Sequence, residues 1–431
     1  MPYLGAIADD FTGATDLATM LVARGFRTVV TVGPPGAAST ADPGTGNPGG
    51  PEEEEPDAVV VALKSRTAPV ADAVADSLAA LHALRAAGCR RFYLKYCSTF
   101  DSTPEGNIGP VADALLDELG APGTVVVPAF PATGRTVYRA RLFVHDELLD
   151  ESSMRDHPLT PMRDAHLGRL LAPQTRRPVH LIGHDTVRAG ADAVRRALHE
   201  PSAREALSVV DAITDDDLRT IATATADLPL VTGAAGLALG LAGPHEGTAS
   251  RARSAAGPGP GAILSGSASA TTRDQVRHAR EWLPHRKLDL AALRADPDAA
   301  VTALVAFARD AWRAGPDRPP LLYASDGAED VAGALPDAAG LIESALARCA
   351  VELVAAGAHR LLVAGGETSG AVVTALGAGT LRVGAPIAPG VPWVHTEARL
   401  ADGRSRPVDL ALKSGNFGAR SMFTTAWKEL A

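Results

Sequence analysis

The sequence has no long hydrophobic run, no cluster of basic residues and only three cysteines. No apolar stretch is long enough to cross a bilayer as a helix. The net charge of −9, without basic runs, argues against nucleic-acid or anionic-membrane partners. Cys89, Cys97 and Cys349 form no CxxC pair, so neither a disulfide framework nor a zinc site is indicated. The first residues show no secretory signal, and we therefore expect a cytoplasmic protein.

Two common nucleotide-binding motifs are also missing. No GxxxxGK[ST] sequence occurs in the chain. Residues 44–49 match GxGxxG by letter, but no strand precedes them, no helix follows them and a proline interrupts them. We therefore reject them as a dinucleotide site. They belong to residues 33–56, whose proline, glycine and glutamate content predicts a flexible insertion.

The length and composition are those of a two-domain globular protein. The 431 residues exceed the usual size of a single core, and 46% of them are hydrophobic. Short apolar runs alternate with helical periodicity, which predicts an α/β fold in both halves. We expect each domain to be a mainly parallel sheet flanked by helices, with a three-layer, Rossmann-like N-terminal domain. The predicted domains are residues 1–243 and 261–431, joined by an aperiodic linker at 244–260.

Charged residues follow the predicted strands of the N-terminal half. Asp9 and Asp10 follow the strand at 3–8, Arg66 follows the strand at 57–63, and Lys95 and Asp101 lie at the end of the strand at 91–96. The carboxyl ends of parallel strands share one edge of a sheet, where open α/β sheets bind ligands. Each residue alone is more commonly a helix cap or a surface charge. Their recurrence at strand ends predicts an anion-binding substrate site.

A fourth predicted strand, at 124–127, leads into a loop that carries Arg135, another cation available to an anion. Arginine suits bidentate recognition of a carboxylate, whereas lysine supplies a point charge.

The C-terminal half contains loops of glycine and hydroxyl residues after its strands. These loops are residues 265–269, 365–370 and 414–418. Glycine allows close approach of a ligand to the backbone, and the N–H groups of a following helix favour phosphate. The simpler interpretation of the middle loop is a strand-to-helix turn capped by Thr368 or Ser369. Three such loops predict a nucleotide pocket. Further strands are expected at 287–290 and 321–324.

Longer motifs resemble the four-carbon acid sugar kinase family. They are Ala8-Asp-Asp-Phe-Thr-Gly-Ala-Thr-Asp-Leu17, Leu63-Lys-Ser-Arg-Thr67, Gly365-Gly-Glu-Thr-Ser-Gly370 and Ile387-Ala-Pro-Gly-Val-Pro-Trp393. Residues 95–103, 106–110, 156–162 and 412–418 are most similar to the 3-oxo-tetronate kinase branch. The resemblance covers nearly the whole chain. It departs from the family at the long loop 33–56, at residues 233–236 and at Ala268, where cysteine would be common.

The resemblance implies an N-terminal acid-sugar domain, a C-terminal ATP domain and transfer of the γ-phosphoryl group of Mg-ATP to the 4-hydroxyl of a 3-oxo-tetronate. The catalytic residues implied are Asp10, Lys95 and Asp101, and the substrate-binding residues are Asp9, Arg66, Ser98 and Arg135. The residues implied for ATP are Ser265, Ser267, Gly365, Gly366, Glu367, Thr368, Ser369, Gly415 and Asn416. No protein metal ligand is implied for Mg²⁺. The expected partners are the acid sugar and ATP, and the sequence leaves open whether the protein forms a homodimer.

Three alternatives remain. A D-threonate or D-erythronate 4-kinase would share the same motifs. A nicotinamide-dependent dehydrogenase would need a GxGxxG sequence after the first strand, which is absent. A non-catalytic nucleotide sensor would not need the charged residues of the N-terminal half.

Overall fold

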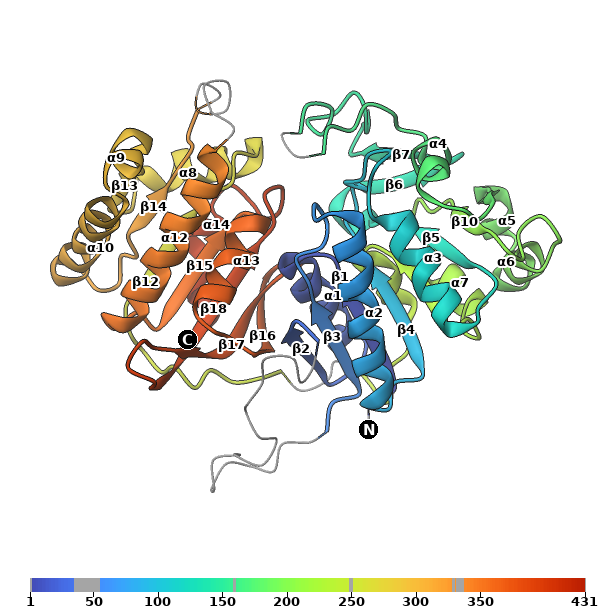
Figure 1. Ribbon diagram of the computed structural model, residues 1–431, viewed down its shortest axis with the longest axis horizontal. Helices are drawn as coiled ribbons and strands as arrows, with labels where there is room; N and C mark the ends of the chain where they lie inside the picture. The colour runs from blue at the N-terminus through green and yellow to red at the C-terminus, as the bar shows by residue number, and fades with distance from the viewer. Residues whose placement is uncertain are drawn as a thin grey trace. The chain divides into compact units, whose positions relative to one another are not determined.

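The computed structural model describes residues 2–34, 55–157, 160–247, 251–327, 330 and 337–430. The chain separates into two compact units, residues 1–250 and 251–431. Each unit is a sheet with helices packed against it, which confirms the predicted α/β fold class (Figure 1). Most of the predicted insertion at 33–56 lies outside the described residues. Among the helices of the described segments, none is long and apolar enough to span a bilayer.

The first unit is built on parallel strands in the order β2-β3-β1-β4-β11-β5-β10-β9. Every residue of β1 and β3 is buried, because helices cover both faces of such a sheet. The strands are β1 (Leu4–Ala8), β2 (Thr28–Val32), β3 (Ala58–Ala62), β4 (Arg91–Lys95), β5 (Thr124–Val127), β9 (Val179–Ile182), β10 (Leu207–Val210) and β11 (Leu230–Gly233).

Helices and a small antiparallel sheet complete this unit. Helix α2 packs against α3, and α1 packs against the 3-10 segment η3. The α-helices are α1 (Phe11–Ala23), α2 (Val70–Ala86), α3 (Ile108–Leu119), α4 (Leu167–Leu171), α5 (His184–Arg188), α6 (Ala191–Leu198) and α7 (Asp215–Ala224). The remaining elements are η1 (Pro131–Thr133), η2 (Ala172–Gln174), η3 (Ala235–Gly240), β6 (Arg135–Tyr138), β7 (Arg141–Val144) and β8 (Glu147–Leu148).

The second unit has strands in the order β13-β14-β12-β15-β18-β17-β16. Neighbouring strands from β13 to β18 in this order pair in parallel, whereas β17 pairs antiparallel with both β18 and β16. The strands are β12 (Gly261–Ser265), β13 (His285–Lys287), β14 (Leu321–Tyr323), β15 (Arg360–Ala364), β16 (Thr380–Ala388), β17 (Val391–Arg399) and β18 (Ser405–Lys413). The strand expected at 287–290 was wrong in position, since Leu290 begins a helix.

The helices of the second unit are α8 (Ala270–Arg280), α9 (Leu290–Ala295), α10 (Pro297–Ala314), α12 (Ala338–Ala355), α13 (Gly366–Ala375), α14 (Met422–Thr425) and the 3-10 segment η4 (Ala426–Leu430). Val276 of α8 and Phe423 of α14 form an apolar core with the strand residues Ile263 and Trp393.

Strand register determines which loops meet at the edge of each sheet. In the first unit Ala8 is the register partner of Ala62 and of Lys95, so the loops after β1, β3 and β4 begin at the same level. In the second unit Ala364 is the register partner of Ser265 and of Lys413. The three glycine loops therefore also begin at one level.

Candidate active site

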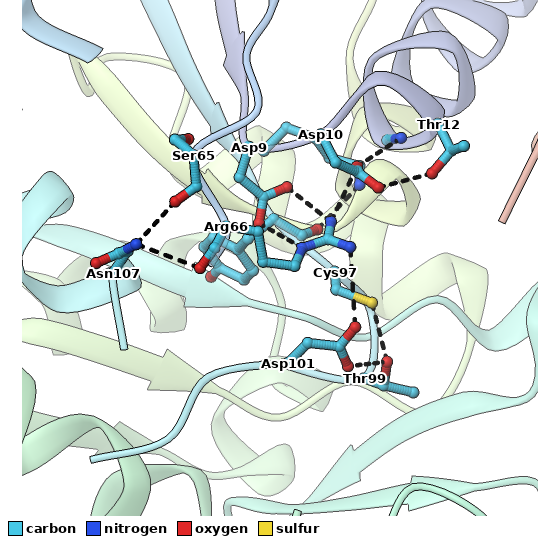
Figure 2. Close-up of polar contacts among 12 residues, drawn as sticks. Asp9, Asp10, Thr12, Ser65, Arg66, Cys97, Thr99, Asp101 and Asn107 are labelled. Atoms are coloured by element: carbon cyan, nitrogen blue, oxygen red, sulfur yellow. Dashed lines mark hydrogen bonds and ion pairs between the residues drawn. The ribbon is translucent and has the colours of Figure 1, made fainter. Parts of the chain in front are cut away.

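Arg66 gathers the acidic residues of the first unit into one cluster. Its Nε and Nη2 donate to the two carboxylate oxygens of Asp9, at 2.9 and 2.7 Å (Figure 2). The same Nη2 lies 2.9 Å from Asp10 Oδ1, and Nη1 lies 3.9 Å from Asp101 Oδ2. Four of the predicted site residues, from the loops after β1, β3 and β4, are thus side by side. The guanidinium forms its bidentate contact with Asp9 rather than keeping both donors for a ligand.

Asp10 is the N-cap of α1. Its Oδ1 accepts from the Gly13 N–H at 2.8 Å and its Oδ2 from Thr12 Oγ1 at 2.7 Å. Burial alone would raise the pKa of Asp10, but Arg66, Lys95 and these hydrogen bonds together lower it. For Asp9, burial outweighs the attraction of Arg66 and the pKa is raised. Because each carboxylate oxygen of Asp10 accepts one of these hydrogen bonds, both oxygens are already engaged within the protein.

Lys95 is a buried cation beside the first turn of α1. It is the last residue of β4 and is only 2% exposed. Its Nζ donates to the Tyr96 carbonyl at 2.9 Å. A Cβ added to Gly13 would lie 3.0 Å from this Nζ, which places the ammonium group next to the helix.

Asp16, on the next turn of α1, is a buried residue that the sequence analysis did not select. Its Oδ1 accepts no hydrogen bond from the described residues. Burial raises the pKa of Asp16 to about 6, although Lys95 opposes the rise. Its position within the motif at 8–17 was the only sequence signal for a role at this site.

The loop after β4 fixes Asp101. Thr99 Oγ1 donates to Asp101 Oδ1 at 2.6 Å and lies 2.9 Å from Cys97 Sγ (Figure 2). Phe100 has a φ of 56°, a left-handed conformation that costs a non-glycine residue on the order of 1 kcal/mol. Its buried ring packs edge-on against Tyr96, with ring centroids 5.7 Å apart. Packing therefore holds this strained loop in place.

Ser98 and Arg135 are also buried. The Arg135 guanidinium donates to the Thr133 carbonyl. Burial lowers the pKa of Arg135, and the charges of Asp101 and Asp16 oppose the shift. Arg135 therefore belongs to the same electrostatic cluster. The loop expected to carry it was wrong, since Arg135 is the first residue of the strand β6.

Asn107 supports the Arg66 loop from the start of α3. Its Nδ2 donates to the carbonyls of Ser65, Arg66 and Ala68 at 2.7, 3.2 and 2.9 Å (Figure 2). Residues 106–110 stand out in the sequence only as a motif, because an amide that binds backbone carbonyls leaves no pattern in a sequence.

In the second unit the loops after β12 and β15 are in contact. Gly365 has a φ of 122°, and a Cβ there would lie 3.0 Å from Thr368 Oγ1 and 3.2 Å from the Ser267 nitrogen. The hydroxyls of Ser265 and Ser369 are buried without a hydrogen-bond partner among the described residues. Helix α13 begins at Gly366 with no side-chain cap. The simpler interpretation, a cap by Thr368 or Ser369, is therefore wrong.

The third loop contacts the loop after β12 and the start of α8 through the carbonyl of Gly415. This oxygen accepts from Ser269 Oγ at 2.6 Å, from Thr272 Oγ1 at 2.7 Å and from Lys413 Nζ at 2.8 Å. A Cβ on Gly415 would lie 2.9 Å from Ser267 Oγ. The other residues predicted for ATP, Gly366, Glu367 and Asn416, lie half-buried on these loops. Unpartnered hydroxyls, close-packed glycine and the N-termini of α8 and α13 fit a phosphate group.

Comparison with known proteins gives consistent matches along the whole chain. A family model described as a sugar-binding N-terminal domain matches residues 4–241, and one described as a nucleotide-binding C-terminal domain matches residues 262–423. The chain is 48% identical to a 3-oxo-tetronate kinase of Cupriavidus necator, over 100% of this chain and 97% of that protein. It is 49% identical to a 3-oxo-tetronate kinase of Burkholderia multivorans, with the same coverage.

A solved structure agrees with these matches. A crystal structure of a Salmonella typhimurium LT2 protein superposes with a TM-score of 0.81 at 39% identity and covers 100% of both chains. The family predicted from the motifs is therefore confirmed. This chain belongs to the four-carbon acid sugar kinase family.

Proposed function

We propose that this chain is an ATP-dependent kinase that phosphorylates the 4-hydroxyl of 3-oxo-tetronate. The observation that carries the proposal is full-length identity of 48–49% to proteins named 3-oxo-tetronate kinase. The two units have the chemistry that such a reaction needs. The first contains buried cations suited to an acid sugar, and the second contains glycine and serine loops suited to phosphates.

In the first unit we assign the substrate carboxylate and oxo group to Lys95 and Arg135. Arg66 instead positions Asp9 and Asp10, since its Nε and Nη2 already donate to Asp9. This division modifies the expectation that Arg66 binds the substrate directly. Ser98, buried in the loop between Lys95 and Asp101, is assigned to the substrate as well.

Asp101 is the better candidate for orienting the reacting hydroxyl. Asp10 accepts three contacts and has a lowered pKa, which makes it a weak proton acceptor. Asp101 accepts one short hydrogen bond from Thr99, and its other oxygen is 3.9 Å from Arg66. In the reaction the O4–H proton would pass to Asp101, O4 would bond to the γ-phosphorus, and ADP would leave. Positioning and charge neutralisation supply most of the catalysis in such transfers.

Mg²⁺ belongs to the same proposal. The described residues contain no group of three His, Cys, Asp or Glu side chains that could hold a metal ion. We expect the ion to be held by the phosphates of ATP, by water and by at most one or two carboxylates, as is common for Mg²⁺ in kinases.

A coupled assay of ADP formation tests the proposal. With ATP and Mg²⁺ present, 3-oxo-tetronate should give turnover with a kcat/KM higher than that of D-threonate or D-erythronate. Higher kcat/KM with either aldonate would reassign the substrate to the close alternative. Absence of ADP with all three acids, together with an absorbance change on adding NAD and a hydroxy acid, would favour the dehydrogenase.

A further inference from the structure

Lys413 is a buried lysine to which neither the sequence analysis nor the proposed function assigns a role. It is the last residue of β18, is 0% exposed and is the register partner of Ala364, directly before the loop at Gly365. The chain has only five lysines, and of these Lys95 and Lys413 are buried. Each of the two is the last residue of its strand and donates to the carbonyl of the next residue at 2.9 Å.

The hydrogen bonds of Lys413 are fully satisfied only in its ammonium form. Nζ lies 2.7 Å from Thr272 Oγ1, 2.9 Å from the Ser414 carbonyl and 2.8 Å from the Gly415 carbonyl. Thr272 Oγ1 itself donates to the Gly415 carbonyl, so its proton is not available to the amine. All three contacts of Nζ are therefore donations; an ammonium group has one proton for each, whereas a neutral amine has only two.

No negative charge balances this ammonium group within the segments that the structure describes. All three of its partners are neutral, and no carboxylate there forms an ion pair with it. The elements around Lys413 carry the charged residues Arg273 and Asp274 at the start of α8, Glu367 on α13 and Arg360 on β15. His395 on β17 and Asp409 on β18 bind each other. Burial lowers the pKa of Lys413 to about 7. A buried cation without a counter-ion is unstable unless an anion binds nearby.

The surroundings of Lys413 are those of the predicted nucleotide loops. The Gly415 carbonyl that it holds also accepts from Ser269, the N-cap of α8. Ala364, its register partner, precedes the Gly365 N-cap of α13. Helix N-termini carry partial positive charge, which adds to the charge of the ammonium group. Two helix N-termini and a buried cation thus surround the same three loops.

We propose that Lys413 supplies the buried positive charge against which the phosphates of the nucleotide bind, and that nucleotide binding completes its protonation. This inference rests on the proposed function, because it takes the ligand of the second unit to be ATP. Lys413 is a positioning residue, since it acts through the Gly415 loop and through its charge. Near pH 8 much of the free protein would have a neutral lysine, and binding would take one proton from solution.

Calorimetry measures this proton directly. A non-hydrolysable ATP analogue with Mg²⁺ is titrated into the full chain at pH 8 in HEPES and in Tris, whose ionisation enthalpies differ. At this pH a terminal phosphate is already ionised, so the nucleotide releases little or no proton of its own. The wild type should take up close to one proton. Lys413→Met should bind at least about tenfold more weakly, as expected for loss of a buried charge, and take up none.

Lys287 provides the matched control. It is the partly exposed partner of Asp326 and Asp330 in the same unit, so Lys287→Met should keep both the affinity and the proton uptake. Tight binding by the wild type without proton uptake would overturn the inference and leave the proposed function standing, whether or not Lys413→Met folds. Equal uptake by wild type and Lys413→Met would also overturn it. Failure of the wild type to bind the analogue would refute the ATP assignment itself.

Discussion

Lys95→Met removes a buried ammonium group while keeping most of the volume of the side chain. Lys95 is 2% exposed, lies beside the first turn of α1 and lowers the pKa of Asp10. Truncating one partner of a buried charge contact costs about 2–5 kcal/mol, and we take about 2–4 kcal/mol for contact with a substrate anion. At about 1.4 kcal/mol per tenfold change, kcat/KM for the acid sugar should fall about 30- to 700-fold.

Two assays separate this effect from general damage. The coupled ADP assay gives kcat/KM for 3-oxo-tetronate at saturating ATP, and calorimetry gives the affinity for an ATP analogue, which should be unchanged. Lys287→Met is the control and should change kcat/KM by less than about twofold, as for other surface substitutions. Loss of ATP affinity with normal use of the acid sugar would reverse the assigned roles of the two units. An unchanged kcat/KM would show that the substrate site is elsewhere.

Three further substitutions test the two sites. Asp101→Asn should lower kcat by at least about tenfold with little change in KM, because it removes a proton acceptor; a changed KM with normal kcat would assign Asp101 to binding. Gly366→Val, at the first residue of α13, should weaken binding of an ATP analogue at least about tenfold in calorimetry. The control Gly379→Val should not weaken binding, because an added Cβ there meets nothing within 4 Å. Equal affinities of the two variants would refute the phosphate-loop assignment. Asp16→Asn should stabilise the protein above pH 6. Burial raises the pKa of Asp16 from 3.8 to about 6, so between these pH values the unfolded chain ionises before the folded one. The wild type therefore loses free energy of unfolding as pH rises through this range, and the variant does not. The gain in free energy of unfolding would be about 3 kcal/mol, at about 1.36 kcal/mol per pKa unit. A difference in melting temperature between variant and wild type that stays constant from pH 4 to pH 8 would contradict this explanation.

The parallel strands could be predicted closely from the sequence. Residues 57–63 and 91–96 were expected as strands, and the structure has β3 (Ala58–Ala62) and β4 (Arg91–Lys95). Strands buried on both faces consist of continuous apolar runs, which makes them visible in a sequence. In contrast, β13 (His285–Lys287) is exposed at every residue, so no apolar pattern indicates where it begins.

The charged cluster could be predicted only in outline. The sequence placed Asp9, Asp10, Arg66 and Asp101 at strand ends, and the register of β1 with β3 and β4 brings these ends together. It could not indicate that Arg66 binds Asp9 in a bidentate contact, because side-chain pairing depends on loop geometry. Asp16 and Lys413 were missed for another reason. Charged residues are rarely buried, so their burial has no signature in a single sequence.

The measurement that tests the central claim most directly is ³¹P NMR of the reaction of the full chain with ATP, Mg²⁺ and 3-oxo-tetronate. Transfer to the 4-hydroxyl predicts a new phosphomonoester signal, split into a triplet by the two protons on C4, that grows in step with ADP. A doublet would place the phosphate on a carbon with one proton and contradict the 4-kinase assignment. Formation of ADP with inorganic phosphate alone, or no change in the ATP signals, would contradict the kinase assignment altogether.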